Sequence, residues 1–121
     1  MAEEENKALI RRAIEEAHNN GHSDVVDEIY ASDYVLHTPT PVPVEAIRGP
    51  EALKLFISTQ HAAFPSLEFT IEDQIAEGDK VVTRYALPGR VPFEAFGVVM
   101  SRITDGKIAE EWIMAPGSEI Q

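Results

Sequence analysis

Cysteine is absent from the 121 residues, and the chain also lacks long apolar runs. Without cysteine there can be no disulfide, no thiolate nucleophile and no Cys-based metal site. No apolar run is long enough to span a bilayer. The N-terminal stretch MAEEENK is acidic and has no apolar core, so it does not have the pattern of a secretory signal. We therefore expect a cytoplasmic protein.

Basic side chains are few. Ten Lys and Arg residues stand against 21 Asp and Glu residues, which gives a net charge of −11. Phosphate backbones and anionic lipids repel a surface of this sign, so neither nucleic acid nor a membrane is an expected partner. A chain of this length supports one hydrophobic core. We expect a single domain over residues 1–121, with residues 1–5 as a disordered tail.

The clearest structural signal is the stretch Val91 to Ala115. It contains two apolar runs joined at Thr104-Asp105-Gly106-Lys107. Asp-Gly between such runs favours a type I′ turn, because both central residues need positive φ. The stretch therefore predicts a long antiparallel hairpin.

Three helices are expected upstream of this hairpin. Residues 6–20 carry an apolar stripe at helical spacing and end at Asn19-Asn20-Gly21. Residues 24–31 form a shorter helix. A third begins at Pro50, which suits the first helical position, and ends at Phe64-Pro65.

Strands are expected at residues 33–38, 67–76 and 80–87, in addition to the hairpin. The prolines of residues 39–43 exclude a central strand there and indicate a loop or rim. The resulting fold class is α+β, with three helices packed on a curved, mostly antiparallel sheet. Such a half-cone favours an apolar cavity that binds a small molecule.

Motifs spread along the chain resemble the nuclear transport factor 2-like superfamily, and within it the SnoaL-like polyketide cyclase and ester cyclase group. The motifs are the helix ending in Asn-Asn-Gly, DYVLH followed by a proline, RGPEAL, AFPSL, AEGDKVV, RITDGKI and Glu111-Trp112. The resemblance implies a cone-shaped, cystatin-like α+β barrel and a homodimer formed through the outer face of the sheet. It does not fix the activity, since this fold carries many functions.

Two departures from the group affect the expected chemistry. The cyclases carry an acid–base aspartate four residues after the tryptophan, where this chain has Pro116. The epoxide hydrolase pattern of an arginine with an aspartate two residues later is absent, because Arg84 is followed by Ala86. In addition, residues 87–91 form a short connection between the strand at residues 80–87 and the stretch that begins at Val91. Relatives have a longer hairpin at this place.

Four residues are candidates for catalysis, each with a plainer alternative. His37 lies where relatives place a pocket histidine, and could instead be a strand-end residue bonded to backbone. Arg84 lies mid-strand, facing either the cavity or solvent. Glu94 lies in an apolar strand, where its pKa would be raised, or at an exposed strand end. Glu110 and its neighbour Glu111 should face opposite sides of the sheet, with one of them inside.

Ligand contacts are predicted for aromatic and apolar side chains: Tyr34, Phe56, Phe96, Trp112 and Met114. Alternation groups Glu110 with Ile108, Trp112 and Met114 on one face. We expect no metal site and no cofactor, because no His, Asp or Glu spacing matches a metal-ligand motif. For the homodimer, the apolar row predicted on the outer face consists of Val81, Thr83, Tyr85 and Leu87.

Two functions follow from these residues and remain open at this point. The first is a cofactor-independent acid–base enzyme of the cyclase, isomerase or hydrolase type that acts on an apolar carbonyl compound. The second is a non-catalytic ligand-binding or dimerisation module, favoured by Pro116 and by the short connection at residues 87–91. The glutamate that faces the interior discriminates between them.

Overall fold

The computed structural model describes residues 2–38, 46–87 and 95–114. Its helices are α1 (Ala2–Arg12), the π-helix η1 (Ala13–Asn19), α2 (Ser23–Ile29) and α3 (Gly49–Ala63). Its strands are β1 (Tyr30–His37), β2 (Ile47–Arg48), β3 (Thr70–Glu77), β4 (Lys80–Leu87), β5 (Ala95–Thr104) and β6 (Lys107–Met114). In these parts of the chain, no helix is both long and apolar enough to cross a membrane.

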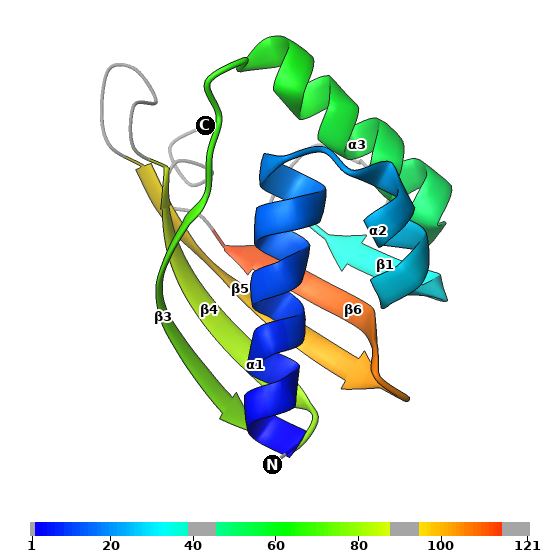
Figure 1. Ribbon diagram of the computed structural model, residues 1–121, viewed down its shortest axis with the longest axis vertical. Helices are drawn as coiled ribbons and strands as arrows, with labels where there is room; N and C mark the ends of the chain where they lie inside the picture. Colours follow the sequence, from blue (N-terminus) through cyan, green and yellow to red (C-terminus); the bar gives the residue numbers. More distant parts are fainter. Residues whose placement is uncertain (1, 39–45, 88–94, 115–121) are drawn as a thin grey trace.

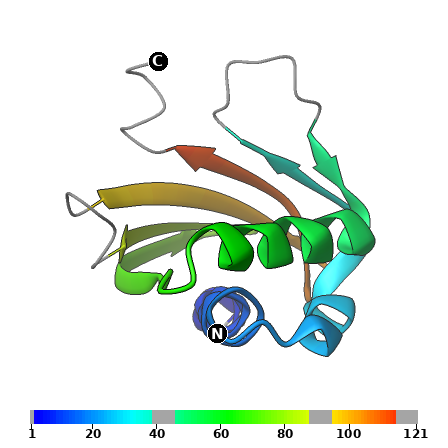
Figure 2. The ribbon, with the colours of Figure 1, turned by 90° about the horizontal axis from the view of Figure 1, so that it is seen from above.

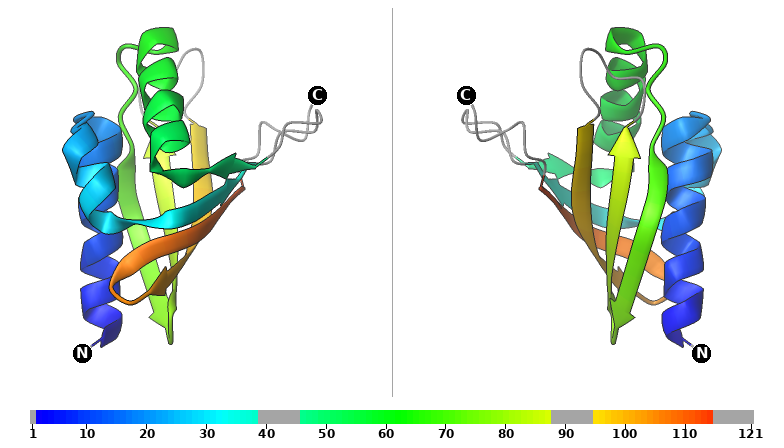
Figure 3. Two further views of the ribbon diagram at one scale, coloured as in Figure 1. Left: turned by 90° about the vertical axis from the view of Figure 1, so that its right-hand side faces the viewer. Right: turned by 90° about the vertical axis from the view of Figure 1, so that its left-hand side faces the viewer.

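The six strands form one sheet in the order β2-β1-β6-β5-β4-β3. All neighbours are antiparallel except β1 and β6, which are parallel. The helices lie on one face, and the sheet curves around α3 (Figures 1 and 2). Figure 3 shows β1 and β6 turning away from the direction of β3, β4 and β5. The predicted α+β class is confirmed, although the sheet is open where the resemblance implied a barrel.

The hairpin between β5 and β6 has the predicted turn. Asp105 has φ 53° and Gly106 has φ 75°, which is the pair of positive values that a type I′ turn requires. Thr104 pairs with Lys107, so the turn has two residues. The local sequence is therefore sufficient to predict this connection.

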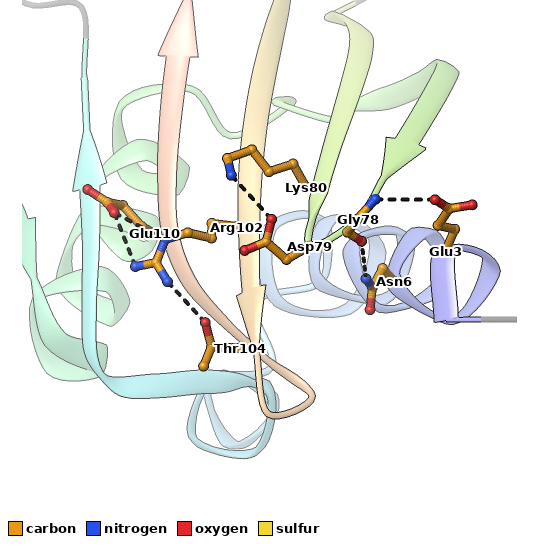
Figure 4. A network of polar contacts seen from close by, with 8 residues as sticks. All are labelled: Glu3, Asn6, Gly78, Asp79, Lys80, Arg102, Thr104 and Glu110. Atoms are coloured by element: carbon orange, nitrogen blue, oxygen red, sulfur yellow. Dashed lines mark hydrogen bonds and ion pairs between the residues drawn. The ribbon is translucent and has the colours of Figure 1, made fainter.

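The N-terminal acidic residues form the start of a helix, where a disordered tail was expected. Helix α1 begins at Ala2, so Glu3, Glu4 and Glu5 lie in its first turn, where negative charge suits the helix dipole. The helix is tied to the turn between β3 and β4 by two hydrogen bonds (Figure 4). Gly78 N donates to Glu3 Oε2 at 3.2 Å, and Asn6 Nδ2 donates to the Gly78 carbonyl at 3.4 Å.

The apolar row that was predicted for the outer face of the sheet lies on the inner face of β4, so that prediction is wrong. Val81, Thr83, Tyr85 and Leu87 are all buried, and two clusters of buried side chains on the helix side of the sheet take in three of them. The alternation of this strand is as predicted, but its two sides are exchanged. Alternation divides a strand into two sets and does not say which set the helices cover.

Gly97 of β5 is required by the packing of Tyr85, its cross-strand partner. A Cβ atom at Gly97 would lie 2.6 Å from the Tyr85 Oη and 2.8 Å from its Cζ. The tyrosine ring therefore lies across the strand at the one position without a side chain.

We predict that Gly97→Ala destabilises the fold by about 1–3 kcal/mol, because the ring has to leave its position or the strands have to separate. Chemical denaturation measures this change. In a Tyr85→Leu background, which removes both clashing atoms, the same substitution should have a much smaller effect. An equal loss of stability in the two backgrounds would contradict the explanation.

Candidate active site

A buried carboxyl group on β6 is the centre of the interior polar contacts. Glu111 is 6% exposed and faces the helices. Its Oε1 accepts a hydrogen bond from the Tyr34 hydroxyl at 2.7 Å, and its Oε2 accepts one from Ser101 Oγ at 2.5 Å. Tyr34 and Ser101 have no exposed surface. Three strands, β1, β5 and β6, therefore each supply one member of this site.

Burial controls the proton affinities of the interior site. It raises the pKa of Glu111, while the hydrogen bonds from Ser101 and Tyr34 act in the opposite direction because they stabilise the ionised form. Burial likewise raises the pKa of Tyr34 well above its usual value, and the nearby charge of Glu111 adds to this effect. Tyr34 is therefore a neutral hydroxyl donor, and Glu111 is a carboxyl group that holds its proton more tightly than an exposed glutamate does.

A β-bulge decides which glutamate faces the interior. Ile103 pairs with Ile108, but Arg102 pairs with Glu110, so Ala109 is an extra residue in β6. Ile108 and Ala109 are consequently both buried, and the alternation restarts with Glu111 inside. The predicted grouping of Glu110 with Ile108 is therefore wrong, while its grouping with Trp112 and Met114 is right.

A second polar cluster lies on the opposite, helix-free face. His37 Nε2 lies 2.7 Å from Glu110 Oε2, and Arg102 donates to Glu110 Oε1 at 3.1 Å. The imidazole also stacks on Trp112, with ring centroids 5.4 Å apart and planes 13° apart. Figure 4 shows Arg102 between Glu110 and Thr104. The hydrogen bond with His37, followed by those from Arg102, lowers the pKa of Glu110.

The predicted catalytic residues are thus partly brought together, but on the outer face. His37 and Glu110 are in contact there, whereas Arg84 is exposed and pairs with Glu72 at 2.8 Å. Glu94 lies outside the described residues. The catalytic roles of all four residues stay predictions.

Of the predicted ligand contacts, only Tyr34 and Phe56 are on the helix side. Phe56 packs against the main core cluster. Phe96 and Met114 are exposed on the outer face, at 54% and 59%, and Trp112 lies on the same face, stacked on His37. A ligand in the interior would therefore meet a different set of side chains from the one predicted.

The role of Ser101 and the placement of His18 were not predicted from the sequence. The His18 ring packs against Tyr30 and Phe69, and burial lowers its pKa to about 4. The pairing of Ser101 with Glu111 depends on the bulge, which periodicity alone does not reveal.

A hollow of about 370 Å³ lies between the first two helical elements and the start of β3. It is lined mainly by polar and charged side chains, among them Arg11, Glu15 and Asn19. It is therefore distinct from the apolar cavity that the sequence predicted, and that cavity stays a prediction. Within the described ranges, no group of three or more His, Asp or Glu side chains could hold a metal ion.

The open, curved sheet with helices on one face places the chain in the nuclear transport factor 2-like, cystatin-like fold class. More specifically, the chain belongs to the SnoaL-like polyketide cyclase family, whose model matches residues 8–117. No curated protein matches the chain.

Solved structures have the same fold. IdmH of Streptomyces antibioticus, a candidate polyketide cyclase, is 27% identical, with a TM-score of 0.78 over 93% of this chain and 92% of its own. A candidate SnoaL-like polyketide cyclase from Jannaschia sp. CCS1 is 21% identical, with a TM-score of 0.80 over 98% and 90%. A Xanthomonas campestris protein of unknown function with a cystatin-like fold is also 21% identical, with a TM-score of 0.78 over 92% and 90%.

We predict that His18 makes the protein sensitive to acid. Its pKa is about 4 in the folded state and about 6.5 in an unfolded chain. The unfolded chain therefore binds a proton in this window while the folded protein does not, and folding stability from this group is lost as the pH falls from 6.5 to 4. In denaturation at a series of pH values, the stability advantage of the natural protein over His18→Phe should shrink by up to about 3 kcal/mol across this window. A stability difference between the two proteins that does not change with pH would contradict the lowered pKa of His18.

Proposed function

We propose that this protein is a cofactor-independent acid–base enzyme of the cyclase or isomerase type, with Glu111 as its proton-transferring group and an apolar carbonyl compound as its substrate. The observation that carries the proposal is the buried position of Glu111, which raises its pKa towards the range useful for general catalysis. Perturbed carboxyl groups of this kind cluster at functional sites. The surroundings of Glu111 favour an apolar substrate. Leu36, which pairs with Glu111 in the sheet, belongs to the hydrophobic core, and Ile113 packs against that core.

The proposed chemistry uses the two hydrogen-bond partners in different ways. The ionised Glu111 carboxylate removes a proton from the carbon beside the substrate carbonyl, and the C–H electron pair moves into an enolate. Tyr34, a neutral donor, turns its hydroxyl from Glu111 to the enolate oxygen. Ser101 keeps its bond to the other carboxyl oxygen and so holds the side chain in place. Glu111 then returns its proton to a carbon or oxygen of the rearranged product.

Exchanging Glu111 for glutamine tests this proposal. Glu111→Gln keeps the shape and hydrogen-bonding capacity of the side chain but cannot take up the substrate proton, so we expect kcat on enolisable carbonyl compounds, including polyketide-type substrates, to fall about 100-fold or more. Glu110→Gln is the matched control, because its side chain is next in sequence and points to the other face. It should leave kcat within about threefold, a change small beside the effect of a lost acid–base group. Turnover retained in Glu111→Gln would overturn the proposal.

The alternative, a non-catalytic binding module, is favoured by one observation. In the described parts of the chain, every buried side-chain nitrogen and oxygen already has a hydrogen-bond partner. Glu111, Tyr34 and Ser101 can therefore be read as a purely structural network. Absence of turnover, together with equal binding of apolar carbonyl ligands by the natural protein and Glu111→Gln, would support this function instead.

We also propose a homodimer formed through the helix-free sheet face. Three large apolar side chains are exposed there, Ile75, Phe96 and Met114, around half-buried neighbours on the same face. Exposed apolar patches of this kind mark interaction sites. Two arginines of the face, Arg84 and Arg102, are paired with the glutamates Glu72 and Glu110. A second copy of this acidic chain would therefore meet a face of low net charge.

For this dimer we predict that Phe96→Glu combined with Met114→Glu weakens self-association at least about tenfold, because two charges would be buried without partners. Sedimentation equilibrium measures the effect. Leu55→Glu is the control, since Leu55 is also exposed, at 68%, but lies on α3. A natural protein that is monomeric at micromolar concentration would contradict the dimer, as would equal weakening by the control.

A further inference from the structure

The π-helix η1 places His18 against the interior network. Hydrogen bonds from i to i+5 make such turns wider than those of an α-helix, and they occur mostly as short segments, often at functional sites. Here the wider turns end with His18 directed at Tyr30 and Phe69, with ring centroids 6.5 Å and 5.9 Å away. The direction of His18 is therefore a product of the unusual helix.

His18 is held at two points. Its Nε2 lies 3.1 Å from the Tyr30 hydroxyl, and its backbone carbonyl accepts a hydrogen bond from His61 Nε2 at 2.5 Å. Because burial lowers the pKa of His18 to about 4, the ring is neutral at physiological pH and has one unprotonated nitrogen that can accept the Tyr30 hydroxyl proton. His18 therefore acts on its neighbours through position and hydrogen bonding rather than through charge.

Contacts continue from Tyr30 to the buried carboxyl. The rings of Tyr30 and Tyr34 meet edge to face, with centroids 4.7 Å apart and planes at 79°. Tyr30 is 2% exposed, and Tyr34 is fully buried, so neither ring can move without displacing the other. The Tyr34 hydroxyl is in turn bonded to Glu111 Oε1. A continuous chain of contacts thus runs from η1 through β1 to β6.

We propose that His18 is a positioning residue for Glu111: by holding the Tyr30 hydroxyl it fixes the Tyr34 ring, and it thereby keeps the Tyr34 hydroxyl on the carboxyl group. The catalytic part of this inference rests on the proposed function of Glu111. Its structural part does not, because the proton affinity of Glu111 can be measured without a substrate. Without His18, Tyr30 loses its hydrogen-bond partner, and Tyr34 donates to Glu111 for less of the time. The ionised carboxylate is then less stabilised, so Glu111 holds its proton more tightly.

The test is a pH titration of the glutamate side-chain carboxyl carbons by NMR in the full-length protein. The Glu111 signal is identified by its loss in Glu111→Gln. In His18→Phe, which keeps an aromatic ring but cannot accept a hydrogen bond, the midpoint should rise by about half a pH unit or more. Tyr30→Phe should produce the same direction of shift. His18→Gln, whose amide oxygen can accept the Tyr30 proton, should restore most of the natural midpoint.

His22→Phe is the matched control, because it exchanges an exposed histidine four residues away for the same ring. Its Glu111 midpoint should equal that of the natural protein. A folded His18→Phe with an unchanged midpoint would overturn the proposal. If His18→Phe fails to fold, an unchanged midpoint in Tyr30→Phe would overturn it equally well, because this variant removes the hydroxyl that His18 holds.

Kinetics separate this proposal from the catalytic one. If Glu111 is the acid–base group, the pH dependence of kcat should shift with the NMR midpoint in His18→Phe, while a purely structural residue would change stability alone. If Glu111→Gln retains activity but the midpoint still moves in His18→Phe, the catalytic role of Glu111 fails and the positioning role of His18 stands.

Discussion

The extra residue in β6, Ala109, is the constraint on which the interior of this protein depends. With a regular ladder from the Asp105–Gly106 turn, Ser101 would lie opposite Glu110 instead of Glu111. The bulge moves each following side chain to the other face, and bulges next to functional sites commonly redirect side chains in this way. A single backbone irregularity therefore determines which of two adjacent glutamates is surrounded by protein and which is near solvent.

The two glutamates consequently differ in their proton affinity. Burial raises the pKa of Glu111, whereas hydrogen bonds with His37 and Arg102 lower that of Glu110. The same residue type thus gives one carboxyl group that holds its proton more tightly than an exposed glutamate does, and one that releases its proton more readily in a surface cluster. Pairs of titratable groups with opposite shifts are informative about acid–base roles. This contrast is the physical basis for preferring Glu111 to Glu110 in the proposed mechanism.

The fold could be predicted because its signals are local. The Asp-Gly turn, the Pro50 helix start and the alternation of β4 each act over a few residues, and the structure has all three. The sides of the sheet could not be predicted in the same way. In β4 the inner set includes Thr83 and the outer set includes Val82, so hydrophobicity hardly separates them. Which set is buried depends on where the helices dock, and that is decided by contacts distant in sequence.

The candidate site was predictable only to the extent that alternation holds. Alternation predicts that one of Glu110 and Glu111 faces inward, and in the structure Glu111 does so. Relatives place their acid–base aspartate four residues after the tryptophan, where this chain has Pro116, which has no proton to transfer. Glu111 precedes Trp112 directly, so an interior carboxyl is present at another position of the same C-terminal segment. In our proposal, acid–base function in this chain depends less on the position of Pro116 than on a carboxyl group that is desolvated between the helices and the sheet.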